Sequence, residues 1–161
     1  MRLFLVLLAA SFTGTALSVW WLSGFVPWFL LPDFSFLAIV FAGLFIPGPL
    51  GLLAAIPPAL FRELTVSAPP WVLFLSSLSL YFLAREVSLR LFLRAESFIL
   101  STTAVLLLLE SVSMVILALL VGSRSFSALW VLKEGIRVAW TSLIAVPLFM
   151  DLSGRWQRVT E

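Results

Sequence analysis

Residues 129–140 read LWVLKEGIRVAW, and this stretch places three charges inside a segment that otherwise suits lipid. Apolar sequence flanks it on both sides, SFSALWVL before and AWTSLIAVPLFM after. A charge at the centre of a bilayer costs about 3 kcal/mol or more on insertion scales. Lys133, Glu134 and Arg137 therefore need compensating groups elsewhere in the chain.

The composition is that of a membrane protein. Of 161 residues, 62% are hydrophobic and 11% are charged, and the mean hydropathy is +1.16. Soluble domains carry about 25% charged residues. We therefore predict an all-α polytopic bundle with residues 1–161 in a single transmembrane domain. The chain has no Cys and no His, which removes disulfides, the commonest metal ligand and the usual general base. We expect no catalytic residue, cofactor or metal.

Six segments approach the length of about 20 apolar residues that a spanning helix needs. The opening MRLFLVLLAASFTGTALS could also be a signal peptide, but its apolar run continues past any cleavage site, so we interpret it as the first span. The expected spans are residues 3–25, 28–46, 50–61, 71–84, 97–121 and 126–150, of which the second and third are short and the fourth has an optional helical extension to residue 92.

Residues 34–61 decide the topology. The turn sequence FIPGPLGLL at 45–53 contains two prolines and two glycines, and Pro57 with Pro58 interrupts the third expected span. With six spans and a cytoplasmic N-terminus, most arginines lie inside, as the positive-inside rule requires. We therefore expect residues 34–61 to enter and return, either as two short spans or as a re-entrant hairpin, with both termini cytoplasmic. The inner arginines are then Arg2, Arg85, Arg90, Arg94, Arg155 and Arg158, and the outer ones are Arg62 and Arg124.

Glu110 is the single charge of the fifth expected span and lies midway along it. The short loop GSRSF makes the last two spans antiparallel neighbours, which brings Glu110 to the depth of Arg137. We predict a buried ion pair between Glu110 and Arg137, shared with Lys133. Such a pair either fixes the helix register or lines a polar pocket or proton path, and the presence of both signs favours the structural or partner-binding interpretation.

Several further residues are candidates for contacts between helices, partners or lipids. Trp130, Lys133, Arg137 and Trp140 follow a spacing of 3, 4 and 3, which places them on one helix face, while Glu134 faces another helix or a partner protein. Asp33 and Glu63 lie at span ends, where a charge costs little. The expected close-packing face of the first span is Ala10 with Gly14 and Ser11 with Thr15. The expected cytoplasmic basic surface, for anionic lipids or a cytosolic partner, is Arg85, Arg90 and Arg94. Candidate partner contacts are Glu63, Glu134, Trp130 and Trp140.

The layout of these segments resembles the MreD family, the rod-shape-determining membrane proteins of bacteria. The resemblance covers nearly the whole chain and is carried by four diffuse motifs. They are LLPDFSFLAIVFAGLF (30–45), GLLAAIPPALFRELTVSAPPW (51–71), LYFLAREVSLRLFLR (80–94) and GIRVAWTSLIAVPLFMDLSGRWQRV (135–159). The chain departs from the family at the end of the third span, where Arg62–Glu63 and Pro69–Pro70 replace an Asp and a Gly-containing turn. Glu63 is the candidate substitute for that acidic group.

The resemblance implies a non-enzymatic inner-membrane subunit of the bacterial cell-elongation (rod) complex. It would bind MreC and, directly or through MreC, RodA and a class-B penicillin-binding protein, thereby helping to organise and regulate peptidoglycan synthesis. Further candidate partners are MreB, membrane lipids and a second copy of the chain. Nucleic acid is not expected as a partner. The fold is expected to be similar to the S-components of energy-coupling-factor transporters. That likeness supplies the rival hypothesis of a vitamin-binding subunit, and a transporter or flippase accessory that uses Glu110 and Arg137 is a third.

Overall fold

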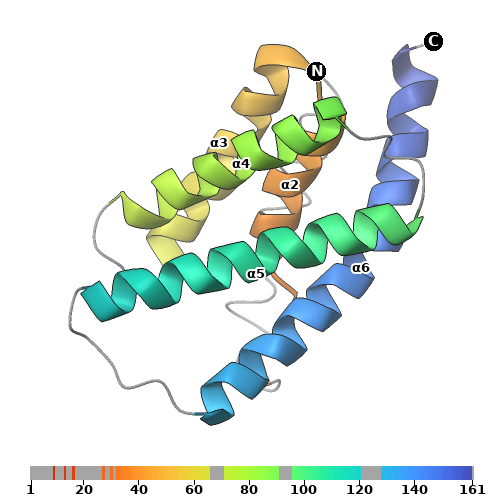
Figure 1. Cartoon of the computed structure of the whole chain (residues 1–161). Coiled ribbons are helices and arrows are strands. Elements are labelled where there is room, and N and C mark those ends of the chain that lie inside the picture. Colours follow the sequence, from red (N-terminus) through yellow and green to blue (C-terminus); the bar gives the residue numbers. More distant parts are fainter. Residues whose placement is uncertain are drawn as a thin grey trace.

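The computed structural model describes residues 9, 13, 16, 27, 30, 32–65, 71–90, 96–120 and 128–160. Every regular element of two or more turns within these residues is an α-helix, which confirms the all-α part of the predicted fold class (Figure 1). The helices are α2 (Phe34–Phe45), α3 (Gly48–Thr65), α4 (Val72–Arg90), α5 (Glu96–Leu120) and α6 (Ala128–Thr160).

Three of these helices are long and apolar enough to cross a membrane. They are α4 over its whole length, α5 over Ser97–Ile116 and α6 over Val131–Ser153. These helices correspond to the fourth, fifth and sixth predicted spans, and α4 includes most of the optional extension. The chain is therefore a membrane protein by the length and composition of its helices. The first predicted span lies outside the described residues, apart from Ala9, Thr13 and Ala16, which are helical.

The second and third predicted spans have different lengths in the structure. Helix α2 begins only at Phe34 because Asp33 caps it, with Oδ1 accepting a hydrogen bond from the Phe36 N–H at 2.9 Å. Its 12 residues extend about 18 Å, well short of a hydrocarbon core of about 30 Å. Helix α3 is longer than predicted, because it continues through Pro57 and Pro58. The prediction that these prolines interrupt it is wrong: α3 packs along both α2 and α4, and this support holds the helix together where two main-chain donors are missing.

Helices α2, α3 and α4 form a closely packed group, called here the α2–α4 unit (Figure 1). A Cβ atom added to Gly43 of α2 would lie 2.7 Å from Cβ of Ala84 and 2.8 Å from the Tyr81 carbonyl oxygen, both in α4. The backbones of the two helices therefore touch. The turn after α2 uses Gly48 at a φ of 65°, a conformation that favours glycine. Residues 34–61 are thus a helical hairpin and not one kinked helix.

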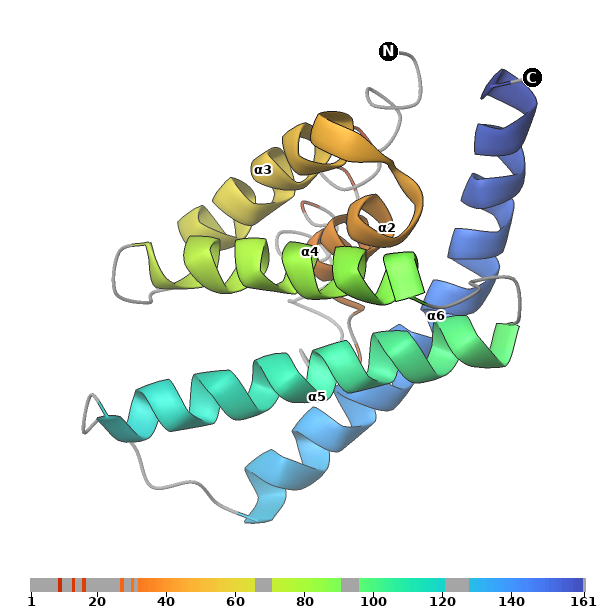
Figure 2. The same ribbon diagram turned by 45° about the horizontal axis from the view of Figure 1, so that its top comes forward.

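Helices α5 and α6 pack on each other and are called here the α5–α6 pair. Helix α6 has 33 residues, about 50 Å, and contains Pro147. Figure 2 shows that α6 crosses α5 and then bends away from it, as expected of a helix with an internal proline. The pair contacts the α2–α4 unit more sparsely, through α4 with α5 and α2 with α6. One such contact is aromatic, with the Phe149 ring 5.3 Å from Phe41 and 5.9 Å from Phe45.

Candidate functional site

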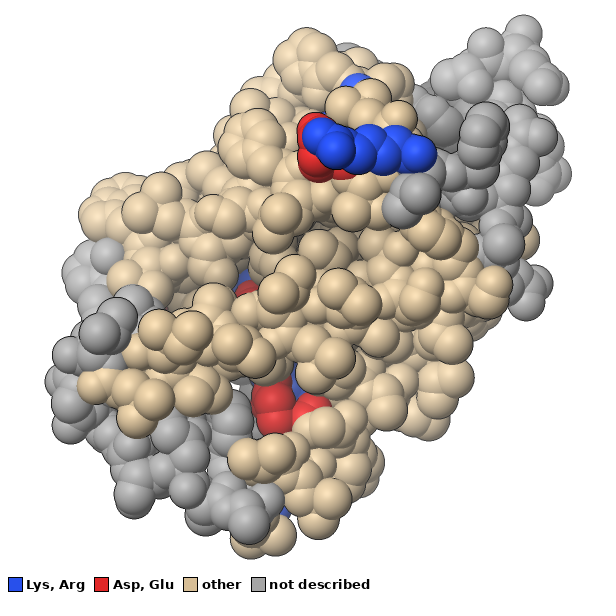
Figure 3. Space-filling model, viewed as in Figure 1, with Lys and Arg blue, Asp and Glu red and all other residues tan. Residues whose placement is uncertain are grey.

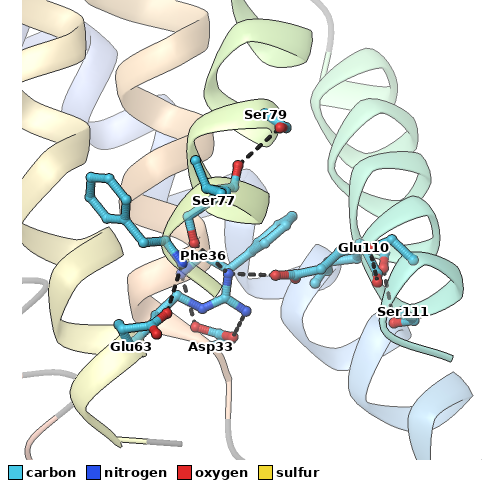
Figure 4. A network of polar contacts seen from close by, with 12 residues as sticks. Asp33, Phe36, Glu63, Ser77, Ser79, Glu110 and Ser111 are labelled. Atoms are coloured by element: carbon cyan, nitrogen blue, oxygen red, sulfur yellow. Dashed lines mark hydrogen bonds and ion pairs between the residues drawn. The ribbon is translucent and has the colours of Figure 1, made fainter. Parts of the chain in front are cut away.

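Arg62, in the last turn of α3, is the centre of a buried polar cluster. Figure 4 shows its partners Asp33, Ser77 and Glu110 around one point. Its Nη2 lies 3.1 Å from Oδ2 of Asp33, and its Nη1 lies 2.5 Å from Oε1 of Glu110. Nη1 also donates a hydrogen bond of 3.2 Å to Oγ of Ser77. One guanidinium on α3 therefore contacts the cap of α2, the second turn of α4 and the middle of α5.

Arg137 of α6 extends the cluster on the other side of Asp33. Its Nη2 lies 3.0 Å from the same Oδ2 atom of Asp33, and its Nη1 lies 3.2 Å from Oε1 of Glu134. Ser111 of α5 donates a hydrogen bond of 2.7 Å to that Glu134 oxygen. The result is a continuous series of alternating charges, called here the charge network, which is Glu110, Arg62, Asp33, Arg137 and Glu134 in spatial order.

The charge network is largely shielded from solvent. The exposed fractions of the side chains of Arg62 and Glu110 are 10% and 4%, and the side chain of Arg137 is the most exposed member at 23%. Figure 3 shows that most of the described surface on this face is uncharged, with acidic atoms recessed between helices. Buried charges are tolerated when each has partners of the opposite sign, and removing one partner leaves an uncompensated charge. The alternation of signs meets this condition at every member.

The predicted direct pair between Glu110 and Arg137 is wrong. Across the described ranges, Glu110 bridges to Arg62, whereas Arg137 bridges to Asp33 and Glu134. The two residues still belong to one network, and Arg62 with Asp33 joins them. The reason is that both joining residues point inward, although sequence analysis placed them at span ends. Lys133, the third predicted member, is half-buried one turn before Arg137 and is engaged in a contact.

The buried face of α6 also differs from the predicted one. It follows Glu134, Val138, Ala145 and Phe149, all of which are buried. Trp140, predicted to share a face with Lys133 and Arg137, is 46% exposed, and the Trp130 side chain lies outside the described part of the chain. Glu134 faces α5, which is the first of the two alternatives that the sequence left open.

Glu63, a candidate partner contact, serves the chain itself. Its Oε1 accepts a hydrogen bond of 2.5 Å from the Trp71 N–H, and its Oε2 accepts one of 2.9 Å from the Phe74 N–H. The carboxylate therefore satisfies donors that the first turn of α4 would otherwise leave unpaired. Trp71, at the start of α4, has a φ of 70°, which is unusual for a residue with a side chain.

The remaining predicted surfaces are described only in part. Arg85 is half-buried, and Arg90 forms an exposed ion pair with Glu86 at 2.5 Å. Arg94 lies outside the described residues. The predicted close-packing face of the first span lies there too, namely Ala10, Ser11, Gly14 and Thr15.

Sequence reasoning missed two members of the network, Asp33 and Arg62. The sequence did contain a signal for Asp33. An Asp just before an apolar run is a typical helix N-cap, and its side chain is held at the start of the helix. A signal for Arg62 was its position directly after the apolar run ALF, which allows α3 to continue past it. Neither signal indicates which charges meet, because that depends on how the helices pack.

Comparison of this chain with models of protein families, with curated proteins and with solved structures finds no match. No group of three or more His, Cys, Asp or Glu able to hold a metal occurs within the residues described above. The charge network and the three apolar helices are therefore the features on which a functional proposal depends.

Proposed function

We propose that this protein is an MreD-like, non-enzymatic subunit of the bacterial rod complex in the inner membrane. It binds a single-span MreC-type subunit and, directly or through it, helps to organise RodA and a class-B penicillin-binding protein in peptidoglycan synthesis. The proposal includes the sidedness of the six-span topology, with cytoplasmic termini, and a fold similar to that of S-components. Its support is the resemblance of the four motifs together with the alternation of opposite charges along the charge network.

The network supports a scaffold better than a transport pathway. A proton path requires groups that gain and lose protons, but an arginine side chain remains protonated in proteins. Arg62 and Arg137 each separate two carboxylates, so a proton could not pass from Glu110 to Glu134 through the network's own contacts. The network instead joins the α2–α4 unit to the α5–α6 pair, which would hold helix surfaces in fixed positions for partners.

The topology within this proposal has a specific form for residues 34–61. Helix α2 is too short to span alone, so the α2–α3 hairpin would enter and return from one side, as the re-entrant alternative describes. Non-spanning backbone at membrane depth is tolerated where protein surrounds it. The burial of nine residues of the twelve in α2 meets that requirement.

The experiment is co-purification with a co-expressed MreC-type single-span subunit. Wild type should retain this subunit, and so should Arg90→Leu, which removes only an exposed ion pair. Arg62→Leu should lose it, because the two parts of the molecule are no longer held together. Glu110→Gln and Arg137→Gln should each reduce folded yield or assembly. Co-purification of wild type with energy-coupling ATPases or a vitamin, in place of the single-span subunit, would establish the rival function.

A further inference from the structure

A lateral groove lies where α4 and α5 diverge. It has a volume of about 300 Å³, and apolar side chains such as Leu83 and Leu109 form most of its walls. Small and polar side chains complete its lining. These are Ser76 and Ser79 of α4 and Ser113 and Glu110 of α5. This groove, which Val72, Leu80 and Met114 also line, is called here the α4–α5 groove.

Glu110 connects this groove to the charge network. Its side chain is 4% exposed, and Arg62, which reaches Oε1, is the one partner of the carboxylate within the described part of the chain. Two of the three serines of the groove use their hydroxyls elsewhere. Ser79 donates to the Leu75 carbonyl oxygen at 2.9 Å, and Ser113 donates to the main-chain oxygen of Glu110 at 2.7 Å. Oε2 therefore has unused capacity to accept a hydrogen bond from an occupant of the groove.

The position of the groove limits what that occupant can be. Both walls are helices that can cross a membrane, so the groove lies at the level of the hydrocarbon. Glu110 lies ten residues before Leu120, the last residue of α5, and the sequence between them is mostly apolar, which is a depth of about 15 Å along the helix. A lipid headgroup stays at the interface and does not reach this depth, whereas a side chain on a transmembrane helix can. An occupant must therefore combine an apolar surface with a hydrogen-bond donor within the membrane.

The small side chains of the groove fit the same kind of occupant. Ser76 and Ser79 are three residues apart, which places them on one side of α4, and Ser113 faces them from α5. Small residues allow membrane helices to approach closely, and in lipid such close packing with interhelical hydrogen bonds drives association.

We propose that the α4–α5 groove is the docking site for the transmembrane helix of a partner, with a Ser, Thr, Asn, Gln or Lys side chain of that helix donating to Glu110. The inference rests on the proposed function in taking the MreC-type subunit as the partner. Docking there would place a partner directly against the residue that joins the two parts of the molecule. The groove is complementary to such a partner, because the Glu110 carboxylate offers it an acidic acceptor.

Photo-crosslinking in membranes tests the location. A benzophenone amino acid is placed at Leu83, in the groove, or at Leu143, an exposed position of α6 outside it, with the MreC-type subunit co-expressed. The adduct with that subunit should be at least about tenfold stronger from position 83. Adducts with the subunit from position 143 but not 83 would overturn the groove assignment and leave the proposed function standing. The groove assignment would also be overturned if position 83 forms adducts with lipid alone in membranes where the subunit co-purifies.

A groove-filling variant gives an independent measurement. Ser79→Trp occupies the space between the helices, whereas Ser101→Trp adds the same bulk to an exposed position of α5 outside the groove. Co-purified subunit should fall by about tenfold or more for Ser79→Trp and stay near wild type for Ser101→Trp, while both variants elute as folded protein. Equal retention by the two variants contradicts the docking site. If wild type itself retains no subunit, the proposed function fails, and the docking site for this partner fails with it.

Discussion

The α2–α4 unit and the contact between this unit and the α5–α6 pair are held together in different ways. Within the unit, helices meet through close backbone approach at Gly43 and through a core in which Phe36, Ile39 and Val40 have no exposed surface. Between the unit and the pair, contacts are sparse and most of the buried charge is concentrated there. Because lipid is as apolar as leucine, burial alone does not hold membrane helices together. Close packing stabilises the interior of the α2–α4 unit, and paired charges stabilise its contact with the α5–α6 pair.

The largest expected effect is at Arg62. Arg62→Leu leaves Asp33 and Glu110 buried without their shared partner, so we expect the free energy of unfolding to fall by about 3–5 kcal/mol. Unfolding of the purified protein by a denaturing detergent measures it. Arg90→Leu is the matched control, because an exposed i, i+4 pair contributes only about 0.3–0.5 kcal/mol. Equal losses in the two variants would show that the network does not join the two parts.

The next effect tests shape fit inside the α2–α4 unit. Gly43→Leu forces a side chain into space already taken by Ala84 and the Tyr81 carbonyl, so we expect a loss of about 1–3 kcal/mol or failure to fold. Gly135→Ala is the control, because a Cβ there meets no atom within 4 Å and alanine favours a helix by about 1 kcal/mol. Thermal unfolding in detergent should shift in opposite directions for the two variants.

A double-mutant cycle measures the weaker of the two links between the α2–α4 unit and the α5–α6 pair, which is the ion pair between Asp33 and Arg137. Asp33→Asn keeps a capping side chain but removes the charge, and Arg137→Leu removes its partner 3.0 Å away. We expect a coupling of about 1 kcal/mol, within the range found for contacting residues. It should be smaller than the coupling between Arg62 and Glu110, because Arg137 is more exposed. A coupling near zero would show that Arg137 does not help to join the α2–α4 unit to the α5–α6 pair.

The smallest expected effect is at the start of α4. Glu63→Ala removes acceptors for the main-chain N–H groups of Trp71 and Phe74, with a loss of about 1 kcal/mol, typical of a helix cap. Glu63→Gln retains one acceptor oxygen and should lose less. Because this contact lies within the α2–α4 unit, neither variant should alter the retention of a partner subunit, which co-purification checks. A loss of partner here would mean that Glu63 itself faces it.

The long helices could be predicted from the sequence because apolar runs of about 20 residues have few other structures available in lipid. Helices α4, α5 and α6 follow that rule. Residues 28–65 do not follow it. The capping carboxylate of Asp33 makes α2 begin late, and packing on α2 and α4 lets α3 continue through Pro57 and Pro58. Propensity and charge counts contain neither effect.

The members of the site were partly predictable, but their pairing was not. Glu110 and Arg137 stand out because each lies in an apolar helix, and both belong to the network. Their direct pairing was inferred from depth alone, and depth does not show which side of a helix faces which neighbour. Glu110 pairs with Arg62 because α3 packs on α4, and Arg62 in its last turn reaches Glu110 of α5.

The network also bears on how the chain can be assembled as it is made. The α2–α3 hairpin supplies Asp33 and Arg62, one acid and one base that contact each other. The α5–α6 pair supplies Glu110, Glu134 and Arg137, with Lys133 one turn away, and is equally balanced. Each hairpin can thus leave the ribosome and enter lipid without net charge from these residues. The α5–α6 pair then packs on an α2–α3 hairpin that has already formed. Arg62 gains an ion pair with Glu110 and Asp33 gains one with Arg137, while their own ion pair stays in place.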